Sequence, residues 1–222
     1  MALSSALSTL LAAVSLIALA PGRAASQYPD RTLATQYASG WENDRLRVRT
    51  VTLEPGAALD RSDDADRVLV YLTADLEGRM PRAEAIWHPV DGPVLENRGA
   101  LRSTAIVIDV KAGPAMGAGA TPPEAQSFSS DVEAQRLIDN AHVVVTKVRY
   151  RSNAYVSIPW HLHVQDVLIV YLRGGQTWLR ADGWDASMPA RRGDIDVIPA
   201  NTLHRVLNAG GDPLEFLVIV SK

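Results

Sequence analysis

The chain has 222 residues, enough for one large or two small domains. Hydrophobic residues make up 47% and charged residues 21%, a composition that supports a buried core and argues against a disordered chain. The net charge of −3 argues against a nucleic-acid binder with a basic surface, and the absence of cysteine excludes disulfides, thiolate metal sites and cysteine nucleophiles.

Residues 1–24 have the features of a targeting signal. The apolar stretch 10–20 has the length of the hydrophobic region of a signal peptide and is short for a membrane span. Gly22 and Ala24 are the small residues expected before a cleavage site that follows Ala24. Because no Lys or Arg precedes the apolar stretch, an uncleaved anchor is the alternative. We expect a secreted or periplasmic protein with no membrane span after signal cleavage.

The remaining chain contains a weak internal repeat of three short segments. Residues 42–51 resemble 139–148, then 67–72 resemble 166–172, and finally 106–111 resemble 217–222. Each segment is rich in β-branched residues and is bounded by turn formers, which predicts strands. Strands at such close spacing predict an all-β sandwich or barrel in each half.

The two halves are joined by a segment of different composition. Residues 112–123 are rich in Gly, Ala and Pro and are expected to form a loop. Ser130 and Glu133 then have the spacing of a helix capping box, so one short helix is predicted over 134–138. The expected organisation is an N-terminal domain over 25–115, a linker with the short helix over 116–138, and a C-terminal domain over 139–222.

The segment Val167–Leu172 is apolar at every position. A strand with one solvated face should alternate, so burial on both faces is the simplest explanation. One face would line the interior of the C-terminal barrel. The other would pack against the N-terminal half or, in a homodimer, against another subunit.

Three of the five histidines suggest a metal site. His161 and His163 are separated by one residue, and residues i and i+2 of a strand project from the same face. Neutral imidazole is a common ligand of Zn, Fe, Ni and Cu. His204 follows a turn and could return opposite this pair. The alternative is that these are ordinary histidines, as we expect for His88 in a loop and His142 at an exposed strand position.

The C-terminal half resembles the cupin superfamily. The family's second motif contains glycine, proline, glycine, histidine and asparagine, and it is matched by Gly193, Pro199, His204 and Asn208, with Asn201 at the usual second glycine. Its first motif is matched by His161, His163 and Gly174, whereas Tyr155 stands at the usual leading glycine and Val167 at the usual glutamate. The resemblance implies two tandem cupin-type (jelly-roll) β-barrels, with a degenerate N-terminal barrel that lacks the histidines.

The missing glutamate leaves the fourth ligand open. Gln165 shares the strand parity of the two histidines and could supply a weak oxygen ligand or bind a metal-bound water. Asp166 should face away and is the less favoured ligand. The resemblance therefore implies a site formed by His161, His163 and His204, with Gln165 as a further candidate, that holds a divalent transition metal such as Fe, Mn, Zn or Ni.

The resemblance also implies the activity. Three neutral ligands leave the charge of the metal uncompensated, which favours a small organic, anionic substrate. A metal-dependent enzyme similar to the three-histidine cupin dioxygenases is the leading hypothesis. The alternatives are a non-catalytic module that binds a small ligand or a metal, and a metal-free isomerase or cyclase in which His161 or His204 is the general base.

Overall fold

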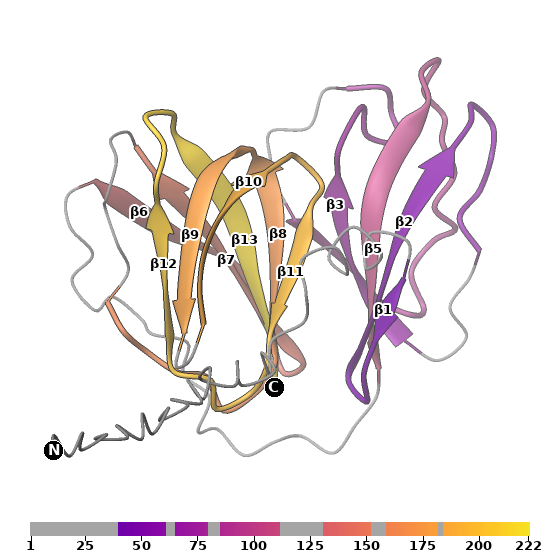
Figure 1. Ribbon diagram of the computed structural model, residues 1–222. Helices are drawn as coiled ribbons and strands as arrows, with labels where there is room; N and C mark the ends of the chain where they lie inside the picture. The colour runs from indigo at the N-terminus through magenta and orange to yellow at the C-terminus, as the bar shows by residue number, and fades with distance from the viewer. Residues whose placement is uncertain (1–39, 61–64, 80–84, 112–130, 152–158, 182–183) are drawn as a thin grey trace, which may run out of the picture.

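The computed structural model describes residues 40–60, 65–79, 85–111, 131–151, 159–181 and 184–222. These ranges form an all-β structure of thirteen strands in three sheets (Figure 1). The strands are β1 (Trp41–Glu42), β2 (Leu46–Leu53), β3 (Ala65–Tyr71), β4 (Ala85–His88), β5 (Ser103–Lys111), β6 (Val132–Asp139), β7 (Val143–Tyr150), β8 (Val167–Arg173), β9 (Gly175–Ala181), β10 (Trp184–Ala190), β11 (Ile195–Ile198), β12 (His204–Asn208) and β13 (Leu214–Ser221).

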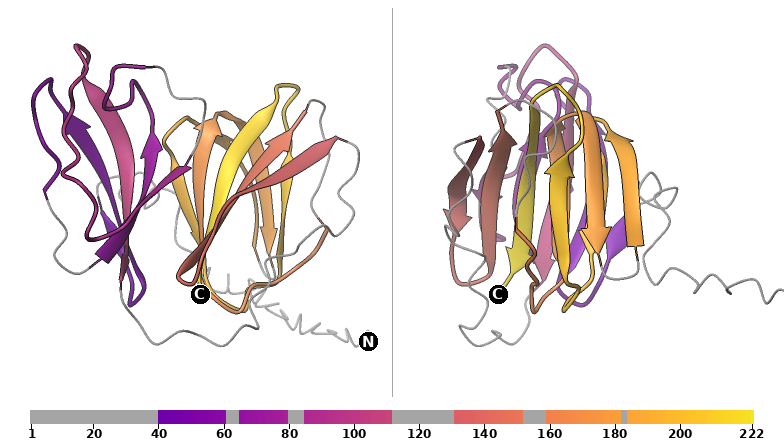
Figure 2. Two further views of the ribbon diagram at one scale, coloured as in Figure 1. Left: turned by 180° about the vertical axis from the view of Figure 1, so that it is seen from behind. Right: turned by 60° about the vertical axis from the view of Figure 1, so that its left-hand side comes forward.

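The two halves of the chain pack sheet against sheet. The N-terminal half forms a five-stranded sheet in the order β1-β2-β5-β3-β4, and the C-terminal half forms a five-stranded sheet, β11-β8-β13-β7-β6, and a three-stranded sheet, β10-β9-β12. The two five-stranded sheets lie face to face, as Figures 1 and 2 show. Buried side chains from both sheets, including Val68, Ile108, Leu168 and Ile219, form one cluster between them. This cluster joins the halves through apolar contact.

Strand β8 is buried on both faces, as its sequence predicts. Leu168 and Val170 belong to the cluster between the two halves. Val167 and Ile169 belong to a second cluster, which also contains Val206 of the three-stranded sheet. The N-terminal half of the same chain therefore covers the outer face of β8, while its inner face lines the C-terminal sandwich.

The N-terminal sheet has a second apolar face, and its own loops cover it. Leu69 and Val107 of this sheet gather with Leu59 and Leu95 from the loops. The two loop segments pair with each other, because the backbone N–H of Leu59 donates to the carbonyl oxygen of Leu95 at 2.7 Å. The N-terminal half is thus a sandwich with one full sheet and a thin second layer.

The internal repeat reappears in the turns that precede β2 and β7. Asn43 accepts, through Oδ1, hydrogen bonds from the backbone N–H groups two and three residues later, at 2.8 and 2.7 Å. Asn140 does the same at 2.9 and 2.9 Å. Lys111 and Lys222, at the ends of β5 and β13, each bind the acidic side chain that precedes the asparagine. Equivalent residues therefore make equivalent contacts in the two halves.

The predicted short helix over 134–138 is wrong. These residues belong to strand β6, which pairs with β7 along its length and lies at the edge of the C-terminal sheet. The side chain of Glu133, expected in a capping box, instead binds Arg151 at 2.7 Å. Hydrogen bonding to the neighbouring strand supplies partners for the whole segment and outweighs a weak local helix signal.

The predicted signal segment 1–24 and the predicted loop 112–123 lie outside the described residues. Among the residues that are described, none forms a helix long and apolar enough to cross a membrane. The five strands β1 to β5 precede residues 112–130, and the eight strands β6 to β13 follow them.

Candidate metal centre

The structure brings together the three histidines that the sequence singles out. His161 and His204 are paired as an isolated antiparallel bridge, with backbone N–H to carbonyl distances of 3.0 and 2.9 Å. The ring centroids lie 4.3 Å apart for His161 and His204, 5.0 Å for His161 and His163, and 5.5 Å for His163 and His204. One ligand nitrogen from each of the three rings lies within 4.8 Å of the others. Their side chains therefore converge on one point.

The turn before β12 sets the position of His204. Asn201 adopts a left-handed backbone conformation with φ of 60°, which asparagine tolerates better than most residues. Its N–H donates to the carbonyl oxygen of His163 at 2.6 Å. This bond ties the turn to the segment that carries the other histidines, which forms an isolated bridge at His161 and not the strand expected from the sequence. The family's usual glycine at this position and the asparagine of this chain thus meet the same conformational need.

Two of the rings are oriented by backbone carbonyls. Nδ1 of His161 lies 2.7 Å from the oxygen of Pro159, and Nδ1 of His204 lies 2.8 Å from the oxygen of Thr202. A carbonyl oxygen only accepts, so both Nδ1 atoms carry the proton. The lone pair of each ring is then on Nε2. A histidine that donates from Nδ1 to a carbonyl can bind a metal through Nε2, so both rings are in the tautomer of a metal ligand.

Burial keeps the rings neutral. It lowers the pKa of His163 to about 3, with a further contribution from the two neighbouring histidines, and the pKa of His204 to about 4. Burial also lowers the pKa of His161. All three groups are therefore unprotonated at neutral pH, and unprotonated imidazole is the form that binds metals.

Gln165 is buried, and it follows His163 by two residues in the sequence. Its side chain is 8% exposed, and its Oε1 is buried without a hydrogen-bond partner among the described residues. Burying a carbonyl oxygen without a hydrogen-bond partner costs free energy, and a contact with a metal ion or a metal-bound water would offset this cost. The strand parity on which this prediction rested is not observed, because residues 162–163 are in no strand and the backbone bends at 164–165. The role of Gln165 as a ligand therefore stays a prediction.

Asp166 has a different task. Its Oδ1 accepts a hydrogen bond from the backbone N–H of Ala200 at 2.9 Å, and its Oδ2 accepts one from Nδ2 of Asn43 at 2.8 Å. Both oxygens are engaged away from the histidines, which agrees with the expectation that this side chain faces outward. Asp166 connects the turn before β12 to the N-terminal half.

The other singled-out residues lie outside the cluster. Asn208 binds the loop before β13, donating to the carbonyl oxygen of Asp212 at 2.8 Å. His142 is exposed in the turn before β7, and His88 ends strand β4 instead of lying in a loop. Sequence patterns missed the carbonyls of Pro159 and Thr202, because a backbone oxygen carries no residue-type signal.

The fold is similar to that of solved cupin structures. No protein-family model matches the chain, and no curated protein is significantly similar to it in sequence. A protein described as glyoxylate-induced, from Pseudomonas aeruginosa, is similar with a TM-score of 0.59 and 15% identity over 82% of this chain and 76% of that chain. A cupin 2 conserved barrel domain protein from Leptotrichia buccalis has a TM-score of 0.51 and 16% identity, over 82% of this chain and 86% of its own.

A third similar structure is that of an enzyme. A variant of salicylate 1,2-dioxygenase from Pseudoaminobacter salicylatoxidans, in complex with gentisate, has a TM-score of 0.57 and 11% identity over 82% of this chain and 72% of that chain. At such identities the similarity establishes the fold and not the activity. The chain has an all-β fold of two cupin-type sandwich domains, and its C-terminal domain carries a candidate three-histidine metal centre.

Proposed function

We propose that the protein is a metal-dependent cupin enzyme whose C-terminal domain binds a divalent transition metal. The observation that carries this proposal is the convergence of three neutral imidazoles, two of them oriented through Nδ1. Nitrogen ligands bind such metals at roughly 2 Å, so three histidine side chains can share one ion only when they converge in this way. His161, His163 and His204 would hold the metal, and Gln165 is the candidate for a weaker fourth contact.

The donor set indicates the class of substrate. Three neutral nitrogens do not compensate the charge of a divalent ion, so an anionic group such as a carboxylate, enolate or thiolate would be attracted to it. When bound, the metal supplies Lewis acidity and, if it is iron, the ability to react with O₂. The similarity in fold to a dioxygenase structure that contains gentisate makes oxygenation of a small organic acid the first reaction to test. Iron, manganese, zinc and nickel are the metals to compare.

The protein's own residues would set the conditions for this chemistry. The carbonyls of Pro159 and Thr202 hold two rings in the ligand tautomer. Burial of His163 and His204 excludes competing protonation. A site prepared in this way binds metal with little reorganisation.

Metal analysis of the full chain, purified without a histidine tag, tests the proposal. We expect close to one equivalent of a transition metal in the unaltered protein. Replacing His161 and His163 with alanine should remove it, whereas His142→Ala, an exposed histidine outside the cluster, should not. Unchanged metal content in the first variant would refute the metal site.

A non-catalytic binding module is the second candidate. It is favoured by the absence of a carboxylate from the histidine cluster within the described ranges. Oxygen consumption with a panel of aromatic and aliphatic acids, before and after chelation, separates the candidates. Metal-dependent consumption supports the enzyme, ligand binding without consumption supports the module, and turnover that survives chelation supports a metal-free general base.

We also propose that the protein is exported, with residues 1–24 as a cleaved signal peptide. The support is the length of the apolar stretch and the small residues at 22 and 24. The mass of the protein recovered from its natural compartment tests this. A mature chain that begins at Ala25 is expected, and a retained N-terminus would indicate an anchor.

A further inference from the structure

Exposed apolar side chains gather around the segments that carry the three histidines. Eight large apolar side chains of the described ranges are between 44% and 56% exposed. Four of them are immediate sequence neighbours of a histidine of the candidate centre: Trp160, Leu162, Val164 and Leu203. Single exposed apolar residues are ordinary on a protein surface, whereas several together usually mark a contact with another molecule.

These side chains lie on the outside of the C-terminal sandwich, behind the histidines. Antiparallel pairing joins His161 to His204, and His204 faces the interior with 2% exposure. Because neighbours of paired residues point to the opposite face, the bridge places Leu162 beside Leu203 on the outer surface. Within the described ranges the N-terminal half packs on the five-stranded sheet, so it leaves this outer surface uncovered (Figure 1).

Two arginines extend the same surface across the three-stranded sheet. The register pairs Arg205 of β12 with Arg180 of β9, and Arg180 with Asp185 of β10. Nη2 of Arg180 lies 2.9 Å from Oδ2 of Asp185, so that charge is compensated. Arg205 has no acidic partner among the described residues; its guanidinium carbon lies 5.1 Å from the ring centroid of Trp160, and its Nε is buried without a hydrogen-bond partner. The surface therefore keeps one uncompensated positive charge beside its apolar side chains.

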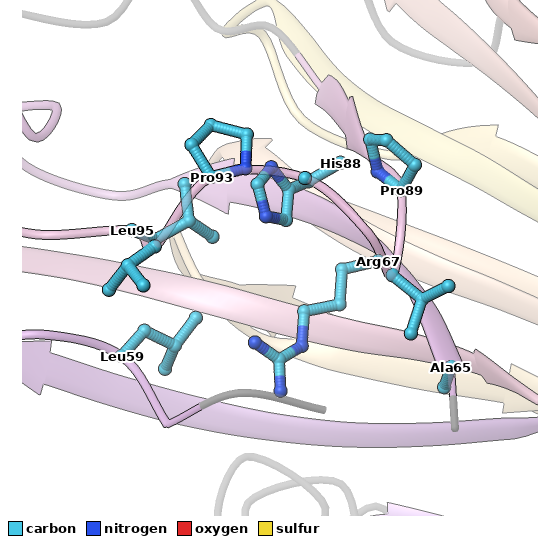
Figure 3. Close-up of a pocket in the computed structure, with 10 residues that line it drawn as sticks. Leu59, Ala65, Arg67, His88, Pro89, Pro93 and Leu95 are labelled. Atoms are coloured by element: carbon cyan, nitrogen blue, oxygen red, sulfur yellow. The ribbon is translucent and has the colours of Figure 1, made fainter. Parts of the chain in front are cut away.

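The exposed apolar side chains of the N-terminal domain have a different setting. Arg67, which Figure 3 shows behind the loop after β4, is 4% exposed and is bound to Asp109 at 2.8 Å. Leu101 is followed by Arg102, which is paired with Glu54 at 2.6 Å. These two cations are compensated, whereas Arg205 is not.

We propose that the outer patch, formed by Trp160, Leu162, Val164, Leu203 and Arg205, docks the protein onto an anionic lipid surface. The aliphatic side chains would enter the boundary between headgroups and acyl chains, where tryptophan is also favoured. The guanidinium of Arg205 would bind a lipid phosphate, because its geometry matches that group.

Other occupants match one part of the patch and not the other. A second copy of the chain would bring the same cations toward each other. An acidic protein surface would compensate Arg205 but would place carboxylates against four apolar side chains. An anionic lipid surface offers both a negative charge and a hydrocarbon layer, so it matches the whole patch.

The charge of the whole chain makes this docking specific to the patch. The net charge is −3, so adsorption of the protein to an anionic surface through its average charge is unfavourable. Docking would hold the candidate metal centre directly behind the wall that contacts lipid. The proposal does not depend on metal binding, because none of the five patch residues is a candidate ligand.

Sedimentation with lipid vesicles tests the proposal. The test uses the chain that begins at Ala25, which removes the apolar stretch 10–20 as a source of lipid binding and retains all thirteen described strands. We expect about fivefold tighter binding to phosphatidylcholine vesicles that contain phosphatidylglycerol than to phosphatidylcholine alone, and weaker binding as salt is added. No binding to the anionic vesicles, or equal binding to both kinds, would overturn the proposal.

Matched variants locate the contact. Leu162→Ser combined with Leu203→Ser should bind the anionic vesicles about tenfold more weakly. Ile86→Ser combined with Leu101→Ser removes two similarly exposed side chains of the N-terminal domain and should leave the affinity unchanged. Arg205→Gln should lose the preference for phosphatidylglycerol, about fivefold. Equal losses in the two serine variants would contradict the assignment to the patch.

Should the variant at Leu162 and Leu203 not fold, the fluorescence of Trp160 decides. Vesicles with brominated acyl chains should quench it, so quenching should be smaller in Trp160→Phe than in the unaltered protein. Equal quenching in both proteins would refute the site. An affinity for soluble polyglutamate as high as that for the anionic vesicles would overturn the proposal in favour of an acidic protein partner.

Discussion

Asp166 connects the N-terminal domain to the turn that positions His204. Its carboxylate accepts one hydrogen bond from the backbone N–H of Ala200 and one from Nδ2 of Asn43. Replacing Asp166 with alanine removes both contacts and leaves the N–H of Ala200 without its partner. We therefore expect Asp166→Ala to weaken metal binding, although Asp166 is not one of the candidate metal ligands.

The size of the effect follows from the two bonds. A hydrogen bond to a charged group contributes about 1.5–3 kcal/mol, and partial exposure of this carboxylate places both bonds at the lower end. The expected loss in the free energy of unfolding is therefore about 3 kcal/mol. For a chain of this size, that corresponds to a decrease in Tm of roughly 6–12 °C. Residues that orient metal ligands typically change metal affinity by about 10–100-fold, so a tenfold weaker metal affinity is expected as well.

Asp66 provides the matched control. It is the repeat counterpart of Asp166, and its Oδ1 accepts a hydrogen bond from the backbone N–H of Val90 at 2.8 Å, outside the cluster of His161, His163 and His204. Asp66→Ala should lower Tm by a few degrees and leave metal affinity unchanged, as measured by calorimetry and by competition with a chromogenic chelator. Equal metal affinities for Asp166→Ala and the unaltered protein would refute the positioning role of Asp166.

Three further predictions concern the same centre. Asn201→Val should destabilise the protein by about 1–2 kcal/mol in urea unfolding, because φ is 60° there, while Asn201→Gly should not; equal stabilities would contradict this. In metal-free protein, the free energy of unfolding should decrease as the pH falls from 6.5 toward 4 and then 3, because His163 and His204 bind protons more readily in the unfolded chain than in the folded one. Replacing both histidines with alanine should remove this pH dependence. Gln165→Ala should weaken metal affinity and Gln165→Glu should strengthen it, in chelator competition; three equal affinities would exclude Gln165 as a ligand.

The fold was largely predictable because its strands carry strong local signals. The unbroken apolar stretch of β8 indicates burial on two faces, and the repeat indicates two similar halves. The helix predicted over 134–138, which is strand β6 in the structure, was wrong because the local signal there is weak. Its Glu133 fits a helix cap by spacing alone, but the segment forms a hairpin with the following strand β7 and completes the edge of the sheet, and this pairing outweighs a weak capping signal.

The candidate site was predictable to the extent that side-chain identity defines it. The spacing of His161 and His163 and the motif around His204 were sufficient to identify the cluster. The contacts that orient the rings come from backbone carbonyls, which any residue could supply.

The two halves combine a shared framework with different interiors. In each, an aspartate near the start of β3 or β8 accepts an N–H from the loop that follows the neighbouring strand, β4 or β11: Asp66 from Val90, and Asp166 from Ala200. Each aspartate also approaches the opposite half, Asp66 at 4.0 Å from Nε2 of His142 and Asp166 at 2.8 Å from Asn43. The contacts that place the loops are thus repeated, whereas the interior side chains differ. Asp109 is buried between Arg47 and Arg67 in the N-terminal sheet, and valines are paired at the matching positions of the C-terminal sheet, Val220 with Val144 and Val167. Such a framework can hold a candidate metal centre in one domain and a buried network of charges in the other, because each depends on a few interior side chains and not on the strands that support them.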